Sequence, residues 1–232
     1  MTMTETSVIS RRKALKTPRS AAIAGIIFSV LYGASMVLMN ISLPHEPTAF
    51  LAWLETDTTT VTLALNLIPY AGIAFLWFIG VIRDLLSDME DRLFATVFLG
   101  SGLLFLALTF MGAALAGGLL SSYAIESSVL VQSGVLTYSR KVIYHIFNIY
   151  AIRMAGVFMI SLATIWLRTG LMHRGWAFLT YILALVLLLS IDYSFWVTLI
   201  FPGWVLVVSA YILIRNLRNQ PREDLREVDT KS

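Results

Sequence analysis

Arg153 is the residue of this sequence whose chemistry stands out most. It lies eleven positions into Val142–Leu167, an apolar stretch long enough to cross a membrane. An ionisable side chain near the middle of such a stretch costs roughly 2.5–3.5 kcal/mol, so we expect it to face the interior of a helix bundle and find acceptors there. At about 100° per residue, Thr164 falls within about 20° of Arg153 and His145 within about 80°. Together with Asn148, these residues predict a helix face that is partly polar along its length.

Candidate acceptors for Arg153 also occur in the other apolar stretches. They are Asn66, Tyr70, Tyr32 and the backbone carbonyl that Pro69 leaves without its helical donor. One interpretation is an anion or head-group site, or a gate. The other, which we favour, is a buried Arg that holds helices together through hydrogen bonds. No Asp or Glu lies at a matching depth, which argues against a proton relay.

A second candidate for a functional site is the acidic segment that follows the second apolar stretch. Asp84, Asp88 and Asp91 would share one face of a helix, an arrangement that can hold a divalent metal. A solvated loop that pairs with Arg83 or Arg92 is the simpler interpretation, and we favour it. There is no Cys and no catalytic or phosphate-binding motif. We therefore expect no metal site and no cofactor, and the sequence leaves enzymatic activity open while favouring its absence.

The composition indicates the class of protein in which these residues stand. The chain has 232 residues, of which 58 % are hydrophobic and 13 % charged, and its mean hydropathy is +0.79. A soluble domain carries about a quarter charged residues. The composition therefore argues against a soluble globular protein, a disordered chain and a nucleic-acid-binding domain, and we expect a lipid bilayer as the partner and no nucleic acid.

Six stretches are long and apolar enough to serve as membrane helices, which need roughly 20 residues. The sequence therefore predicts an all-α, polytopic bundle of six transmembrane helices over residues 21–214. A basic tail, 1–20, would precede it and a charged tail, 215–232, would follow it; we expect the latter to be disordered or a frayed helix extension. The predicted helices cover Ala21–Leu43, Val61–Ile82, Phe94–Leu119, Val142–Leu167, Trp176–Ser190 and Phe195–Ile214.

The basic residues predict the orientation of this bundle. With the N-terminus in the cytoplasm, fourteen of the 17 Lys and Arg fall in cytoplasmic segments, and only Arg140 and Lys141 fall in an outer loop, Leu120–Lys141. Short cytoplasmic loops carry an excess of Lys and Arg in membrane proteins. This asymmetry predicts an even number of crossings with both termini cytoplasmic, and it explains the net charge of +3 without an anionic partner.

The third stretch is rich in small residues, which let membrane helices approach closely. We expect it to be a central helix or the contact surface of a homo-oligomer. The residues concerned are Gly100, Gly102, Gly112, Gly117 and Gly118 with Ala107, Ala113, Ala114 and Ala116.

Three passages, Phe75–Arg83, Arg153–Gly170 and Phe201–Val205, resemble a family of multi-pass membrane proteins of unknown function that is common in actinobacteria and related bacteria. The resemblance covers most of the chain from about residue 60 onward. It implies a bacterial cytoplasmic membrane and Arg153 as a recurrent feature, and it implies no activity.

The sequence thus favours a bacterial inner-membrane protein without enzymatic activity, of an accessory, structural or interaction type. The first alternative is a small-solute or ion transporter or channel that uses the polar seam around Arg153 and the break at Pro69. The second is a membrane-embedded enzyme that modifies lipids, for which the segment Asp84–Asp91 would have to face a groove at membrane level.

Overall fold

The computed structural model describes residues 3–42, 58–86, 92–170, 172–190 and 195–229, and nearly all of them are helical. No strand occurs in these ranges. The helices are α1 (Met3–Ser42), α3 (Thr59–Leu86), α4 (Arg92–Gln132), α5 (Val135–His145), the π-helical turn η1 (Ile146–Ala151), α6 (Ile152–Thr169), α7 (Arg174–Leu189) and α8 (Phe195–Asp229).

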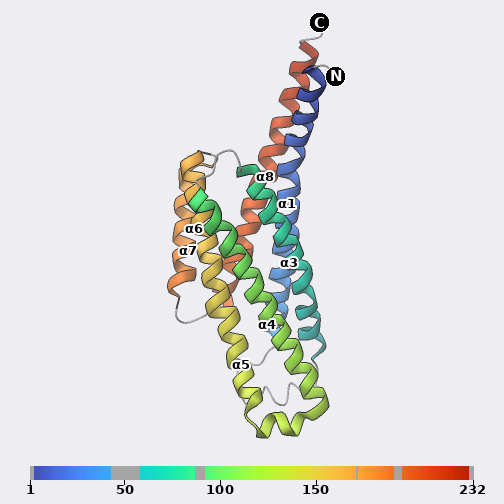
Figure 1. Cartoon of the computed structure of the whole chain (residues 1–232), viewed down its shortest axis with the longest axis vertical. Helices are drawn as coiled ribbons and strands as arrows, with labels where there is room; N and C mark the ends of the chain where they lie inside the picture. The colour runs from blue at the N-terminus through green and yellow to red at the C-terminus, as the bar shows by residue number, and fades with distance from the viewer. Residues whose placement is uncertain (1–2, 43–57, 87–91, 171, 191–194, 230–232) are drawn as a thin grey trace.

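The helices lie roughly along one direction and form an elongated bundle (Figure 1). Helix α1 packs against α3 and α8, while α6 packs against α4 and α7. Both ends of the chain lie at one end of the bundle, where α1 and α8 continue beyond the other helices, and the turn between α4 and α5 lies at the opposite end (Figure 1). The predicted all-α class is confirmed.

Five helices of the described chain are long and apolar enough to cross a membrane. Their apolar segments are Arg19–Ser42, Thr59–Asp84, Leu93–Ile125, Val135–Thr169 and Trp196–Arg215. The fifth predicted helix, Trp176–Ser190, is not among these five; it corresponds to α7, which has only 16 residues. At about 1.5 Å per residue it is about 24 Å long, against about 30 Å for the hydrocarbon core of a bilayer.

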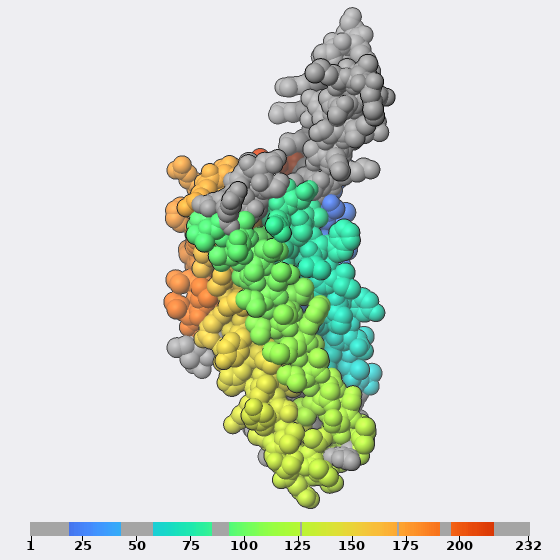
Figure 2. Space-filling model, in the orientation of Figure 1, coloured from blue at the N-terminus to red at the C-terminus, as the bar shows by residue number. Residues whose placement is uncertain are grey.

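The segment predicted as an outer loop, Leu120–Lys141, is helical instead. Helix α4 continues to Gln132, and α5 starts at Val135 after a turn at Gly134, whose φ of 73° favours glycine. Tyr123 and Leu136 form a small apolar cluster between the two helices. This cluster holds the two helices together as a hairpin, which forms the yellow-green lower end of the molecule in Figure 2.

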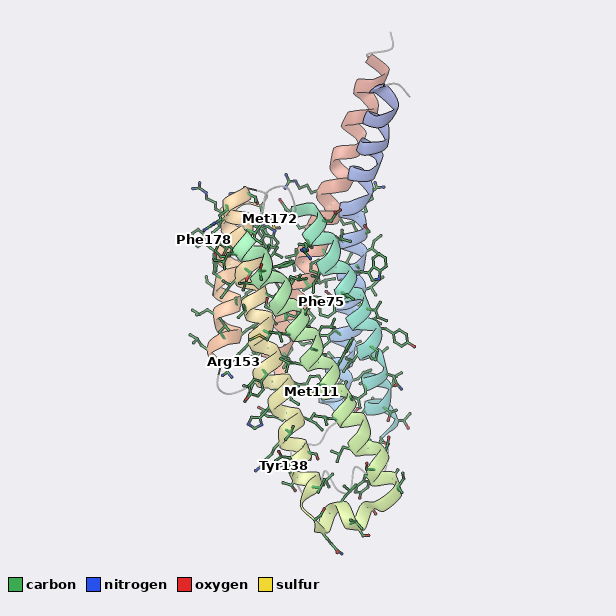
Figure 3. All side chains as sticks on the ribbon, viewed as in Figure 1. Phe75, Met111, Tyr138, Arg153, Met172 and Phe178 are labelled. Carbon is green, nitrogen blue, oxygen red and sulfur yellow. The ribbon has the colours of Figure 1, made fainter. Side chains whose placement is uncertain are left out.

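Aromatic rings fill the centre of the bundle. Phe75 of α3 lies there (Figure 3), with its ring centroid 4.6 Å from that of Phe28 and 5.4 Å from that of Phe158. Such pairs contribute about 0.5–1.5 kcal/mol each beyond the area they bury. The cluster joins five helices through Phe28, Tyr32, Phe75, Phe78, Phe98, Phe105, Phe158, Trp166, Phe201 and Trp204.

The glycines of α4 lie in two different environments, one packed against other helices and one open. A Cβ added to Gly102 would meet Ile79 and Phe158, so this glycine lets α4 approach α3 and α6 within the same chain. At Gly117 and Gly118 the same Cβ meets nothing within 4 Å. The prediction of a central helix therefore agrees with the first part of α4, and the second part presents open small residues at the surface.

Candidate functional site

Arg153 follows η1 at the start of α6 and contacts the end of α7. Its Nε donates a hydrogen bond to the carbonyl oxygen of Leu188 at 3.5 Å, and its side chain is half-buried. The last four carbonyls of a helix have no partner within that helix. A cation at this end also interacts favourably with the helix dipole. Arg153 therefore caps the C-terminal end of α7 (Figure 3).

Thr164 lies on the same face of α6, three turns further along, and also contacts α7. Its Oγ1 donates to the carbonyl of Ile160 at 2.8 Å and lies 2.7 Å from the hydroxyl of Tyr181. A hydroxyl has one proton, so Thr164 accepts its second bond from Tyr181. The predicted alignment of Thr164 with Arg153 agrees with the structure, since both side chains reach the same neighbouring helix.

Gly156 lies between these two contacts. An added Cβ would stand 3.2 Å from the carbonyl oxygen of Ala184 and 3.1 Å from Cγ of Leu188. The absence of a side chain at Gly156 thus lets the two helices approach closely here. The interface between α6 and α7 consists of a polar contact toward each end and a close backbone approach between them.

The predicted acceptors on α3 do not partner Arg153. The buried face of α3 is set by Ile68, Ala71 and Phe75, at helical spacing. Asn66 and Tyr70 lie on the other side of the helix and are exposed. Arg153 finds its acceptor on α7 instead, because α7 packs directly against α6 and offers carbonyls that its own helix leaves unpaired.

The two remaining acceptors on the predicted list are also accounted for by packing. Helix α3 runs through Pro69 without interruption, and the carbonyl that Pro69 leaves free is that of Leu65, whereas the acceptor of Arg153 lies on α7. Tyr32 lies in the aromatic cluster, with its ring centroid 5.6 Å from that of Phe105. Neither residue therefore contributes to the surroundings of Arg153.

His145 and Asn148 make hydrogen bonds within their own helix. Nδ1 of His145 lies 2.6 Å from the carbonyl oxygen of Lys141, and Nδ2 of Asn148 donates to that of Tyr144 at 3.0 Å. Both residues stand at the π-helical turn, which has one residue more than an α-helical turn. They share a stretch of helix with Arg153 but do not contact it in the described structure.

The π-helical turn has a packing cause. Helices α5 and α6 both pack against α4, yet Leu136, the buried residue of α5, is about one residue out of phase with the buried face of α6 for a continuous α-helix. Phe147 packs where α4 has Gly112, since a Cβ added there would stand 2.7 Å from its ring. The extra residue brings both buried faces onto α4.

A contact that the sequence did not predict joins α7 to α8. Nε1 of Trp204 donates to Oγ1 of Thr180 at 3.0 Å, and Thr180 in turn donates to the carbonyl of Trp176 at 2.8 Å. Both side chains are buried. A Thr and a Trp within apolar stretches give only a weak indication of a hydrogen bond between helices, because nothing in the sequence shows which helices are neighbours.

The acidic and metal-ligating residues of the described bundle do not gather at one place. Among the described residues no group of three or more His, Cys, Asp or Glu could hold a metal ion. Asp84 is exposed at the end of α3, and Asp88 and Asp91 lie outside the described residues. Comparisons with models of known protein families, with curated proteins and with solved structures find no match to this chain.

Proposed function

We propose that this chain is a multi-pass integral membrane protein of accessory or structural type, without enzymatic activity, in a bacterial cytoplasmic membrane. The observation that carries the membrane placement is the apolar surface of its five long helices. Large apolar side chains such as Ile27, Ile73, Leu104 and Leu206 are exposed along the bundle. In water a surface of this kind would be an association site, whereas lipid covers it at no cost. The resemblance noted in the sequence supports the bacterial membrane.

The arrangement of the chain supports six crossings with both termini in the cytoplasm. Both ends of the chain lie at the same end of the bundle, an arrangement that supports an even number of crossings (Figure 1). Helix α7 would then be the short sixth span. Arg83, Arg168, Arg174 and Arg215 mark the end of the bundle that holds the termini, in agreement with the excess of Lys and Arg on the cytoplasmic side of membrane proteins.

The packing of the bundle favours an accessory role over transport. A transporter needs a polar path through the centre, but there Phe75 and its neighbouring rings pack against one another. The polar groups of α6 bond to α7 or to their own helix. A transporter with a path along α6 is the second candidate, and a lipid-modifying enzyme built on the acidic segment after α3 is the third.

We also propose that α4 forms the contact surface of a homo-oligomer. Gly117 and Gly118 present open space at their Cα atoms on a helix of 41 residues, which at about 1.5 Å per residue is roughly twice as long as a bilayer core requires. Small residues of this kind let a second helix approach closely.

Single cysteines test the number of crossings, because the native chain has none. Arg174→Cys at the start of α7 and Trp196→Cys at the start of α8 are treated with a membrane-impermeant thiol reagent in intact cells and in inverted vesicles. We expect Trp196→Cys to react in cells and Arg174→Cys only in inverted vesicles. Reaction of both from one side would contradict the sixth crossing.

A further inference from the structure

The contacts between α7 and α8 fix the level of Arg153 along the bundle. Trp204 bonds to Thr180, so these two residues lie side by side. Leu188 lies eight residues beyond Thr180, and Trp196 lies eight residues before Trp204, which is about 12 Å of helix in each case. The two helices run in opposite directions. Leu188, and Arg153 with it, therefore lies at about the level of Trp196.

This level corresponds to the outer edge of the hydrocarbon core, given the membrane placement proposed above. Trp196 is 73 % exposed, and Trp is enriched at membrane interfaces. From Trp196 to Arg215 at the cytoplasmic end, α8 has 20 residues, or about 30 Å, which matches the thickness of the core at about 30 Å. Arg153 thus lies at the depth of the outer lipid head groups, not at mid-bilayer.

The guanidinium of Arg153 is held in place but not saturated. Its Nε is bound to the carbonyl of Leu188, whereas its Nη1 and Nη2 have no hydrogen-bond or ion-pair partner among the described residues. These nitrogens are not among the buried side-chain atoms without a partner in the described part of the chain. Four N–H groups are therefore available to an external acceptor, in a planar arrangement that matches phosphate oxygens.

The π-helical turn places a second polar group on the same side of the helix. In a regular α-helix, His145 and Arg153 would be separated by about 80°. The additional residue in η1 reduces this angle to about 20°. The His145 ring is exposed, and its Nδ1 faces Lys141, so its Nε2 is the nitrogen left to face outward. The side of the helix that carries Arg153 therefore has a second polar side chain further from the cytoplasm.

We propose that Arg153 binds a phosphate group at the outer surface of the cytoplasmic membrane, on the helix side that carries His145 about 12 Å further out. The ligand chemistry is a phosphate with free oxygens, which either an outer-leaflet phospholipid or free phosphate provides. Charge-assisted hydrogen bonds from Arg to phosphate oxygens are shorter and roughly twice as strong as neutral ones. This inference rests on the membrane placement in the proposed function, but not on an accessory role.

The test compares Arg153→Gln with a control that removes an equal charge at the other end of the bundle, Arg174→Gln. The purified full chain is titrated with phosphatidylglycerol in detergent, and bound lipid is counted by native mass spectrometry. We expect Arg153→Gln to weaken the tightest binding event about tenfold, and Arg174→Gln to leave it unchanged. Equal binding by all three proteins, or equal weakening in both variants, would overturn the proposal.

A second arm separates the two sources of phosphate. The same proteins are titrated with inorganic phosphate, and the midpoint of thermal unfolding is followed. If phosphate raises the unfolding midpoint in an Arg153-dependent way and the lipid does not bind, the site is assigned to a free anion. If the lipid binds and phosphate leaves the midpoint unchanged, the site is assigned to a lipid head group. Binding of neither the lipid nor phosphate to the native protein would overturn the proposal.

A third measurement does not require the Arg153 variant to fold. His145→Cys is labelled with an impermeant maleimide, with Tyr138→Cys on the exposed surface of α5 as the matched control. We expect phosphatidylglycerol to slow labelling at position 145 severalfold and to leave position 138 unchanged. Equal rates at position 145 with and without the lipid would contradict a head group that extends outward from Arg153 over this side of the helix. The membrane crossings are tested separately by Arg174→Cys and Trp196→Cys, so failure of either idea is recognisable.

Discussion

The hydrogen bond between Trp204 and Thr180 gives a sharp test of how the helices are held together. The substitution Thr180→Val keeps the shape of the side chain and removes its oxygen. Nε1 of Trp204, 3.0 Å away and on a side chain that is only 5 % exposed, then loses its acceptor. A buried donor without a partner costs about 1–3 kcal/mol. Interhelical bonds in membranes average about 0.6 kcal/mol and reach about 1.7.

Because both side chains are buried, we expect Thr180→Val to lower the free energy of unfolding by about 1–2 kcal/mol. The assay is unfolding by sodium dodecyl sulfate in mixed micelles, followed by far-ultraviolet circular dichroism. In a double-mutant cycle with Trp204→Phe, the coupling energy should lie at about 0.6–1.7 kcal/mol. Thr169→Val is the matched control, since this hydroxyl bonds only to the carbonyl of Ile165 in its own helix, at 2.9 Å.

The control should change stability by less than about 0.5 kcal/mol. A coupling energy indistinguishable from zero, or equal losses for Thr180→Val and Thr169→Val, would refute the reasoning. The first result would mean that the two side chains lie close together without stabilising one another. The second would mean that the loss comes from the helix itself and not from the contact between helices.

Two further substitutions test the packing of α4 and the end of α6. Gly112→Val places a branched side chain against the ring of Phe147, and we expect it to lower the free energy of unfolding by about 1–3 kcal/mol. Gly118→Val is the control, because its side chain enters open space and should change this free energy little unless α4 forms an oligomer. Gly170 has a φ of 65°, so Gly170→Ala should cost about 1–2 kcal/mol in the same unfolding assay, and an unchanged midpoint would show that this conformation is not required.

The sequence predicted the helices from hydropathy and the alignment of Thr164 with Arg153 from helical geometry. Both depend only on local spacing. It could not predict that Arg153 would bond to Leu188, because this contact depends on which helix packs beside α6 and on where that helix ends. Asn66 and Tyr70 were proposed as acceptors on polarity alone, and the apolar stripe of α3 that includes Phe75 turns them outward.

The hairpin formed by α4 and α5 was missed for a related reason. The segment Leu120–Lys141 is too polar to predict a membrane helix, so hydropathy assigned it to a loop. The contact of Tyr123 with Leu136 stabilises it as a helix, but only once the turn at Gly134 has brought the two halves together. The extra residue in η1 was likewise invisible, because it compensates a phase difference between two faces that both pack on α4.

The central claim is that the bundle crosses a membrane as a packed structure without a water-filled path along α6. Labelling of single cysteines at Asn148, Val157 and Ile160 tests it most directly, with an impermeant reagent applied to cells and to inverted vesicles. We expect Asn148→Cys to react from the outer side only, and Val157→Cys and Ile160→Cys to react from neither side. Reaction at Val157 or Ile160 would contradict a packed bundle and place the transporter first among the proposed functions.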